Sequence, residues 1–224
     1  MSLALARLPS RTDYVEEVYR VLLDAISDGS LAPGARLTQE EIAEQLSVSR
    51  SPVLQALRLL KKDGLVQDAP GRGLLVAPLD PQGIGKLYEV RGALDALAAR
   101  LAAQRGARIP PALIVAGRRA SRGKDVKAMI DADVEFHHAL YEASGNPLIA
   151  LSAQTHWVHL RRVMGAVLQA SGSRDAIWDE HQAIADAVEA GDADRAARLV
   201  ELHTDKARRN LLDRLGKVLA EREA

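Results

Sequence analysis

The sequence predicts a mainly α-helical protein in two parts: short helices followed by a strand hairpin, then an all-α antiparallel bundle of six helices. Apolar residues form 47% of the 224 residues but aromatic residues only 3%, so the core is mostly alanine, leucine, valine and isoleucine. Long alanine- and leucine-rich stretches favour helix. The stretch "LVQDAPGRGLLVAP", residues 65–78, instead indicates two short strands around a glycine-containing tip.

Composition excludes several classes of protein, and the distribution of charge indicates one local basic segment. There is no cysteine, which excludes disulfides and thiolate metal sites. The N-terminus lacks the pattern of a signal peptide, and no stretch approaches the roughly 18 apolar residues of a membrane span, so we expect a cytoplasmic protein without membrane association. The formal net charge is zero, yet residues 13–44 hold eight acids against two bases, whereas residues 49–62 hold four bases and no acid.

The first part carries the element order of a winged helix-turn-helix. Residues 14–28 have apolar side chains at helical spacing, and Thr38 and Glu41 stand in the relation of a capping box before a second helix. A third helix is expected over 49–63, after a short turn. The hairpin over 65–78 then supplies the wing.

From Asp80 onward the sequence is helical, interrupted by short segments rich in glycine, proline and serine. We therefore predict a winged domain over 1–78, a linker over 79–83 and a helical bundle over 84–224. The six predicted helices of the bundle are 82–105, 110–121, 124–144, 147–170, 174–190 and 192–222.

The helix 49–63 suits the recognition helix of a helix-turn-helix, whose first residues meet base edges in the major groove. Arg50, Leu54 and Arg58 share the face opposite its apolar stripe, and a serine near its start can reach phosphates. The predicted DNA-contacting residues are Arg50, Ser51, Leu54 and Arg58 on this helix and Gly71 and Arg72 at the wing tip. The alternative is an ordinary solvated basic face.

The stretch "GSLAPGARLTQEEIAEQLSVSRSPVLQALRLLKKDGLVQDAPGRGLLV" resembles the DNA-binding domain of the GntR family of bacterial transcription regulators. The resemblance implies that Arg50 contacts DNA and that Gly71 lies at the wing tip. Leu54 and Gln55 stand where the family usually has arginine and glutamate. We expect Leu54 to pack against a thymine methyl or to touch nothing, with an altered operator; the alternative is that Leu54 is partly buried.

Asp133 and His137 lie four residues apart on one predicted helix face, so they can bind one ion together. His138 is rotated by about 100° from His137 and cannot easily join them. His181 and His203 have apolar neighbours at helical spacing and should face the bundle interior. One carboxylate and three imidazoles in a helical bundle form a divalent metal site with open positions; for the first pair alone, the alternative is a solvated or core-capping role.

The stretches "LYEVRGALDALAARLAA", "DADVEFHHALYEASGNPL" and "EHQAIADAVEAGDADRAARLVELH" resemble the FCD ligand-binding domain of the GntR family's FadR branch, and six helices resemble its VanR-like subgroup. The resemblance implies a divalent metal ion, zinc or nickel, held by Asp133, His137, His181 and His203. It also implies a small organic acid as effector at the metal's open positions. Asp95 stands where glutamate is usual.

Arg91 is the first candidate to pair with the effector's carboxylate, and Arg161 is the second. For Arg91 the alternative is a buried salt bridge to Asp95 or another acid. These features predict an effector-responsive regulator, not an enzyme, that binds an inverted-repeat operator in double-stranded DNA as a homodimer. Two alternatives are a metal-dependent hydrolase whose ion activates water and a constitutive DNA-binding protein with a structural metal site.

Overall fold

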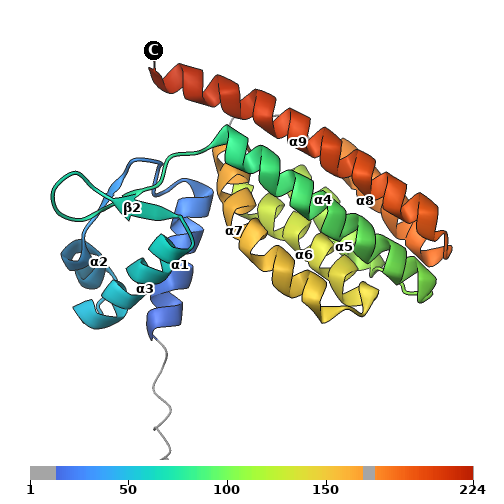
Figure 1. Cartoon of the computed structure of the whole chain (residues 1–224), viewed down its shortest axis with the longest axis horizontal. Coiled ribbons are helices and arrows are strands. Elements are labelled where there is room, and N and C mark those ends of the chain that lie inside the picture. Colours follow the sequence, from blue (N-terminus) through green and yellow to red (C-terminus); the bar gives the residue numbers. More distant parts are fainter. Residues whose placement is uncertain (1–13, 169–174, 224) are drawn as a thin grey trace, which may run out of the picture. The chain divides into compact units, whose positions relative to one another are not determined.

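The computed structural model describes residues 14–168 and 175–223, and these fall into two compact units (Figure 1). The first unit comprises the chain up to Asp24 together with Gly34–Ala77, and the second comprises Ala25–Pro33 together with the chain from Pro78 onward. None of the described helices is long and apolar enough to cross a membrane.

The first unit has the helices and hairpin that the sequence predicts. Its helices are α1 (Tyr14–Asp28), whose last four residues are grouped with the second unit, α2 (Gln39–Gln45) and α3 (Arg50–Lys62). Its strands are β1 (Arg36–Leu37), β2 (Val66–Asp68) and β3 (Leu74–Val76). The three strands form an antiparallel sheet in the order β1-β3-β2. The hairpin of β2 and β3 is the wing. Strand β1 was not predicted, because two residues are too few to show an alternating pattern.

Local sequence explains where the helices of this unit begin and which faces they bury. The Thr38 hydroxyl accepts the backbone N–H of Glu41 at 3.3 Å, which is the first bond of the predicted capping box. The Glu41 carboxylate accepts from the Thr38 hydroxyl at 2.7 Å, whereas a complete capping box would use the Thr38 backbone N–H. Helix α3 buries the apolar stripe Val53, Ala56, Leu57 and Leu60. Tyr19 of α1 donates a hydrogen bond to Asp63, at the end of α3, at 2.7 Å.

The second unit is a bundle whose helices lie within a few residues of the predicted ones. They are α4 (Pro81–Gln104), α5 (Pro111–Ser121), α6 (Val126–Ser144), α7 (Pro147–Leu168), α8 (Asp175–Glu189) and α9 (Ala193–Glu223). Helices α4 and α9 run antiparallel beside each other (Figure 1). Helix α4 begins inside the predicted linker 79–83, because the Asp80 side chain caps it by accepting the N–H of Gln82 at 3.0 Å and Pro81 suits its first turn.

A buried glycine on α5 leaves space for a tryptophan of α8. A Cβ atom on the buried Gly117 would lie only 2.0 Å from the indole ring of Trp178. The same ring packs edge-on against His181, with 4.7 Å between the ring centroids, and against Phe136 at 6.4 Å. The packing of α8 on α5 therefore depends on glycine at position 117.

We predict that Gly117→Ala destabilises the fold by about 1–3 kcal/mol, because the Trp178 ring must move to admit the methyl group. Helix propensity alone would favour alanine by about 1 kcal/mol. Gly216→Ala is the matched control: position 216 is exposed in α9, and a Cβ there meets nothing within 4 Å. That variant should gain about 0.5–1 kcal/mol in urea unfolding, and an equal gain at Gly117 would contradict the packing argument.

Candidate metal centre and nucleic-acid interface

Three histidines from three different helices meet inside the bundle. They are His137 of α6, His181 of α8 and His203 of α9, and one ligand nitrogen from each lies within 4.8 Å of the other two. Their ring centroids are 5.4, 5.6 and 4.7 Å apart. All three are buried, the first two completely. The structure thus brings together the three predicted imidazole ligands.

The predicted carboxylate ligand lies beside this histidine cluster. Asp133 is one turn before His137 on α6, and its Oδ1 is 3.6 Å from Nε2 of His181, too long for a hydrogen bond. Its side chain is 15% exposed and faces a neighbouring cavity. His138 is only partly buried and contacts the ring of Tyr141 instead. The rotation that sets His138 apart follows from the helical spacing.

His181 is a buried imidazole whose polar atoms are unsatisfied. Neither of its ring nitrogens has a hydrogen-bond partner in the described part of the chain. Burial lowers the pKa of His181 well below its ordinary value of 6.5, and the charges of His203, His137 and Arg91 lower it further. Burying unpaired polar atoms is unfavourable, and neutral imidazole is the form that binds metals. The donor set therefore fits a divalent cation.

A carboxylate behind the cluster orients the imidazole of His203. Nδ1 of His203 is 2.9 Å from Oε2 of Glu180, which also pairs with Lys206. This hydrogen bond places the proton of a neutral His203 on Nδ1 and leaves Nε2 as a ligand. Glu180 was not predicted: it precedes His181 in the sequence, but its contact with His203 depends on how α8 packs against α9.

Arg91 and Asp95 form a buried pair on the other side of His137. Nε of Arg91 donates to Oδ2 of Asp95 at 3.0 Å, and Nη2 of Arg91 lies 2.7 Å from Nε2 of His137. Because a guanidinium cannot accept, Nε2 must accept, and the proton of a neutral His137 lies on Nδ1, 3.3 Å from Asp95. Burial alone would raise the pKa of Asp95, but the charges of Arg91 and His137 hold it well below its usual value.

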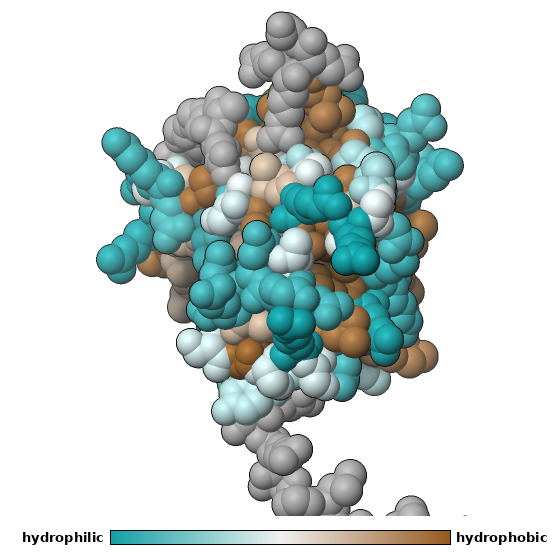
Figure 2. All heavy atoms as spheres, turned by 90° about the vertical axis from the view of Figure 1, so that its left-hand side faces the viewer, coloured by the Kyte–Doolittle hydropathy of each residue, from teal (hydrophilic) through white to brown (hydrophobic). Residues whose placement is uncertain are grey.

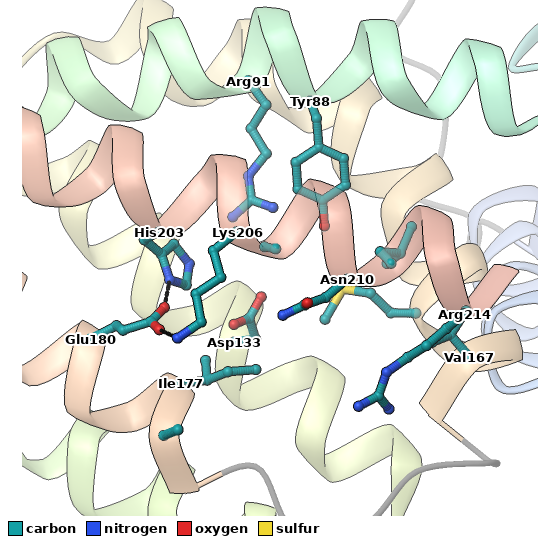
Figure 3. A pocket seen from close by; sticks show the side chains of 14 residues that line it. Tyr88, Arg91, Asp133, Val167, Ile177, Glu180, His203, Lys206, Asn210 and Arg214 are labelled. Atoms are coloured by element: carbon teal, nitrogen blue, oxygen red, sulfur yellow. Dashed lines mark hydrogen bonds and ion pairs between the residues drawn. The ribbon is translucent and has the colours of Figure 1, made fainter.

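A cavity of about 240 Å³ opens beside the cluster (Figure 3). Arg91, Asp133 and His203 line it near the cluster, and Asn210 and Arg214 of α9 line it further along that helix. Arg91 thus combines the two arrangements considered from the sequence, a buried salt bridge and a place on the pocket wall. Arg161 does not line this cavity: it donates to Asp131 at 2.5 Å.

The residues expected to contact DNA lie on α3 and at the wing tip. Arg50, Ser51 and Arg58 are exposed on α3, and Arg50 Nη1 is 3.1 Å from a carboxylate oxygen of Glu40. Leu54 is half-buried. Figure 2 shows mostly hydrophilic side chains, with small hydrophobic areas, on the face that it presents.

The wing tip requires glycine. Gly71 and Gly73 have φ angles of 87° and 94°, which side-chain-bearing residues rarely adopt, and Arg72 is exposed between them. Arg36 of β1 donates a hydrogen bond to the carbonyl of Arg72. This hydrogen bond was not predicted, because strand β1 was not predicted. It holds the backbone of the tip against the sheet.

Comparisons with known proteins agree with this architecture. The chain matches the family described as "Bacterial regulatory proteins, gntR family" over residues 14–76 and the FCD domain over residues 86–206. A protein of Streptomyces ambofaciens named "Uncharacterized HTH-type transcriptional regulator in unstable DNA locus" is 30% identical over 204 residues, which cover 89% of this chain and 85% of that protein. The "Probable D-xylose utilization operon transcriptional repressor" of Paenarthrobacter nicotinovorans is 27% identical, covering 89% of each chain.

Solved structures of regulators share the fold. A GntR transcriptional regulator from Rhodococcus sp. RHA1 superposes with a TM-score of 0.75 at 26% identity, covering 90% of this chain and 99% of that one. McbR/YncC of E. coli superposes with a TM-score of 0.77 at 21% identity, covering 90% and 98%. The predicted fold class is confirmed, and the relatives are regulators rather than enzymes, so the hydrolase alternative is not supported. The chain belongs to the GntR family of bacterial regulatory proteins, as a DNA-binding helix-turn-helix transcription regulator with a C-terminal FCD domain.

Proposed function

We propose that this regulator binds an inverted-repeat operator as a homodimer and that its FCD domain binds a divalent metal ion and a small organic acid that modulates operator binding. One observation carries the proposal: three buried histidines, one without any hydrogen-bond partner among the described residues, adjoin a cavity whose lining includes the cations Arg91, Lys206 and Arg214. Zinc and nickel are the proposed ions, because imidazole ligands suit both.

The ion would be held by His137, His181 and His203, with Asp133 as the carboxylate ligand at the edge of the cavity. Nε2 of His137 would then exchange its hydrogen bond from Arg91 for the ion, while Nδ1 keeps its contact with Asp95. When bound, it supplies positive charge and open coordination positions for a carboxylate. Glu180 holds the imidazole of His203, and Arg91 adds a second cation on the cavity wall. A structural metal site in a constitutive DNA-binding protein is the competing proposal. The cavity beside the cluster favours a sensor, because a purely structural site needs no adjoining space.

The acid changes operator binding only if it binds more tightly to one arrangement of the protein than to another. The reading surface would be α3, with Arg50, Ser51 and Arg58, together with Arg72 of the wing. The ion pair between Arg50 and Glu40 is exposed, with 68% and 59% of the side chains accessible. Such pairs are weak, so Arg50 can exchange this partner for DNA at little cost. Two such surfaces in a homodimer would read the two halves of an inverted repeat.

The metal proposal predicts that His181→Ala loses its ion while His138→Ala keeps it. Protein purified without a histidine tag should hold about one ion per chain by elemental analysis, since a preformed donor set retains metal. His138 is the matched control because it is the neighbour of a proposed ligand and faces elsewhere. Wild-type protein that takes up no zinc or nickel on dialysis would contradict the site.

The sensing proposal predicts that a short-chain carboxylate changes operator affinity by about fivefold or more in the metal-loaded wild type. The same acid should have no effect on His181→Ala. Fluorescence anisotropy with a duplex selected from a random library by the wild-type protein measures both. Equal operator affinity with and without every acid, in a protein that does hold metal, would favour the structural-site alternative.

The reading surface predicts that Leu54→Arg changes the preferred operator, because arginine can read a guanine through two hydrogen bonds whereas leucine cannot. Parallel selections of operators from a random library would compare the variant with the wild type. Leu59→Arg is the control, as residue 59 is exposed on another side of α3. It adds the same charge and should raise affinity without changing base preference. The same preferred site for the wild type and Leu54→Arg would contradict our account of position 54.

Stability of the metal-free protein should fall as the pH drops. Burial lowers the pKa of both His137 and His181 below 6.5 in the folded state. The unfolded chain therefore takes up protons first, so stability is complete above about pH 6.5 and declines below it, by up to about 1.4 kcal/mol per pH unit for each histidine that stays neutral. Urea unfolding between pH 7.5 and 5 measures the slope, which His181→Ala should reduce. A flat profile would show that these imidazoles are not buried as described.

A further inference from the structure

The cavity beside the histidine cluster has polar side chains at both ends. Near the cluster it is lined by Asp133 and His203, and further along α9 by Asn210 and Arg214. Its remaining walls combine the aliphatic side chains of Met164, Val167, Ile177 and Leu211 with the polar groups of Tyr88, Glu180 and Lys206. A ligand that fills this cavity therefore meets polar groups at both ends.

Helix α9 sets the distance between the two polar places. His203, Lys206, Asn210 and Arg214 recur at helical spacing and line one wall. Eleven residues separate the first from the last, which is about 16 Å along the helix axis. Helical side chains lean toward the N-terminus, and the arginine side chain is longer than the imidazole, so Arg214 reaches further back along the axis than His203 does and shortens the span. In Figure 3 the Asn210 amide is directed toward Asp133, and the Arg214 guanidinium extends away from α9 into the same opening.

Two of the cations that line the cavity are paired with carboxylates, whereas Arg214 is not paired in the part of the chain that the structure describes. Arg91 pairs with Asp95 at 3.0 Å, and Lys206 pairs with Glu180. Within the described ranges, neither Arg214 nor Asn210 has a hydrogen-bond or ion-pair partner. A guanidinium binds carboxylates through two parallel hydrogen bonds, which are among the stronger polar contacts in proteins. Both side chains are exposed at the far end of the cavity, so that end can accept a second anionic group.

We propose that the effector is a short aliphatic dicarboxylate. One carboxylate lies at the metal end, near Arg91, and the other is bound by Arg214, with the Asn210 amide donating a further hydrogen bond. This inference rests on the proposed function, because the metal is its first anchor. Arg214 determines the ligand class: a monocarboxylate of equal chain length reaches the metal but leaves the guanidinium without a partner.

The test is calorimetric titration of the zinc-loaded full chain with glutarate and adipate, compared with pentanoate and hexanoate. Each dicarboxylate should bind about tenfold or more tightly than the monocarboxylate of equal length, since a hydrogen bond to a charged group contributes that much. Arg214→Gln should abolish this preference without changing monocarboxylate affinity, and Arg214→Lys should retain part of it. Arg209→Gln is the control: it lies on the same helix, pairs with Asp205 and does not line the cavity, so it should keep the full preference.

The outcomes separate the two proposals. If monocarboxylates bind as tightly as dicarboxylates, or if Arg214→Gln binds dicarboxylates like the wild type, the dicarboxylate inference is wrong while the acid sensor stands. Loss of both classes in Arg214→Gln would also overturn it, because Arg214 would then not act on the second carboxylate alone. If the zinc-loaded protein binds none of the four acids, the proposed effector class fails and the inference with it.

Discussion

The site in the C-terminal bundle depends on the buried ion pair between Arg91 and Asp95. Their side chains are 3% and 0% exposed, so both charged groups are desolvated and need hydrogen-bond partners within the protein in place of water. Asp95 receives a second hydrogen bond from the hydroxyl of Tyr141 at 2.5 Å, and that hydroxyl accepts one from the Trp157 indole at 3.2 Å. The Arg91 guanidinium also lies 4.0 Å from the centroid of the Trp157 ring. The pair thereby fixes α4 against α6 and α7, and it orients His137 within the cluster.

Much of the bundle could be predicted because its signals are local. Apolar spacing gave the helix positions, and the apolar neighbours of His181 and His203 indicated that both face inward. The approach of Asp133 to His181 was expected only from the family resemblance, and the bond between Glu180 and His203 was not predicted, because both depend on the rotation of packed helices about their axes. Arg161 illustrates the same limit, because the sequence does not show that its guanidinium donates to Asp131 instead of lining the cavity.

In the first unit, local patterns predicted the helices and hairpin but not the contacts at the tip. Arg36 follows a proline- and glycine-rich segment, and nothing in that segment indicates that its guanidinium reaches the carbonyl of Arg72. Leu54 is half-buried, which partly agrees with the alternative raised from its apolar character. The many acids before residue 45 confine positive charge to α3 and the wing. A basic surface of this small size favours binding of DNA in one defined position over nonspecific electrostatic binding to phosphates.

The tryptophan seated on Gly117 gives the protein an intrinsic optical reporter. The chain has only two tryptophans. Trp178 lies with its ring centroid 4.7 Å from that of His181, and Trp157 lies beside Arg91 and His137, at 5.2 Å from the latter. One indole therefore adjoins His181, and the other adjoins His137 and the cation on the cavity wall. Fluorescence from the two rings reports on two different sides of the histidine cluster, each of which can be followed separately by replacing the other tryptophan.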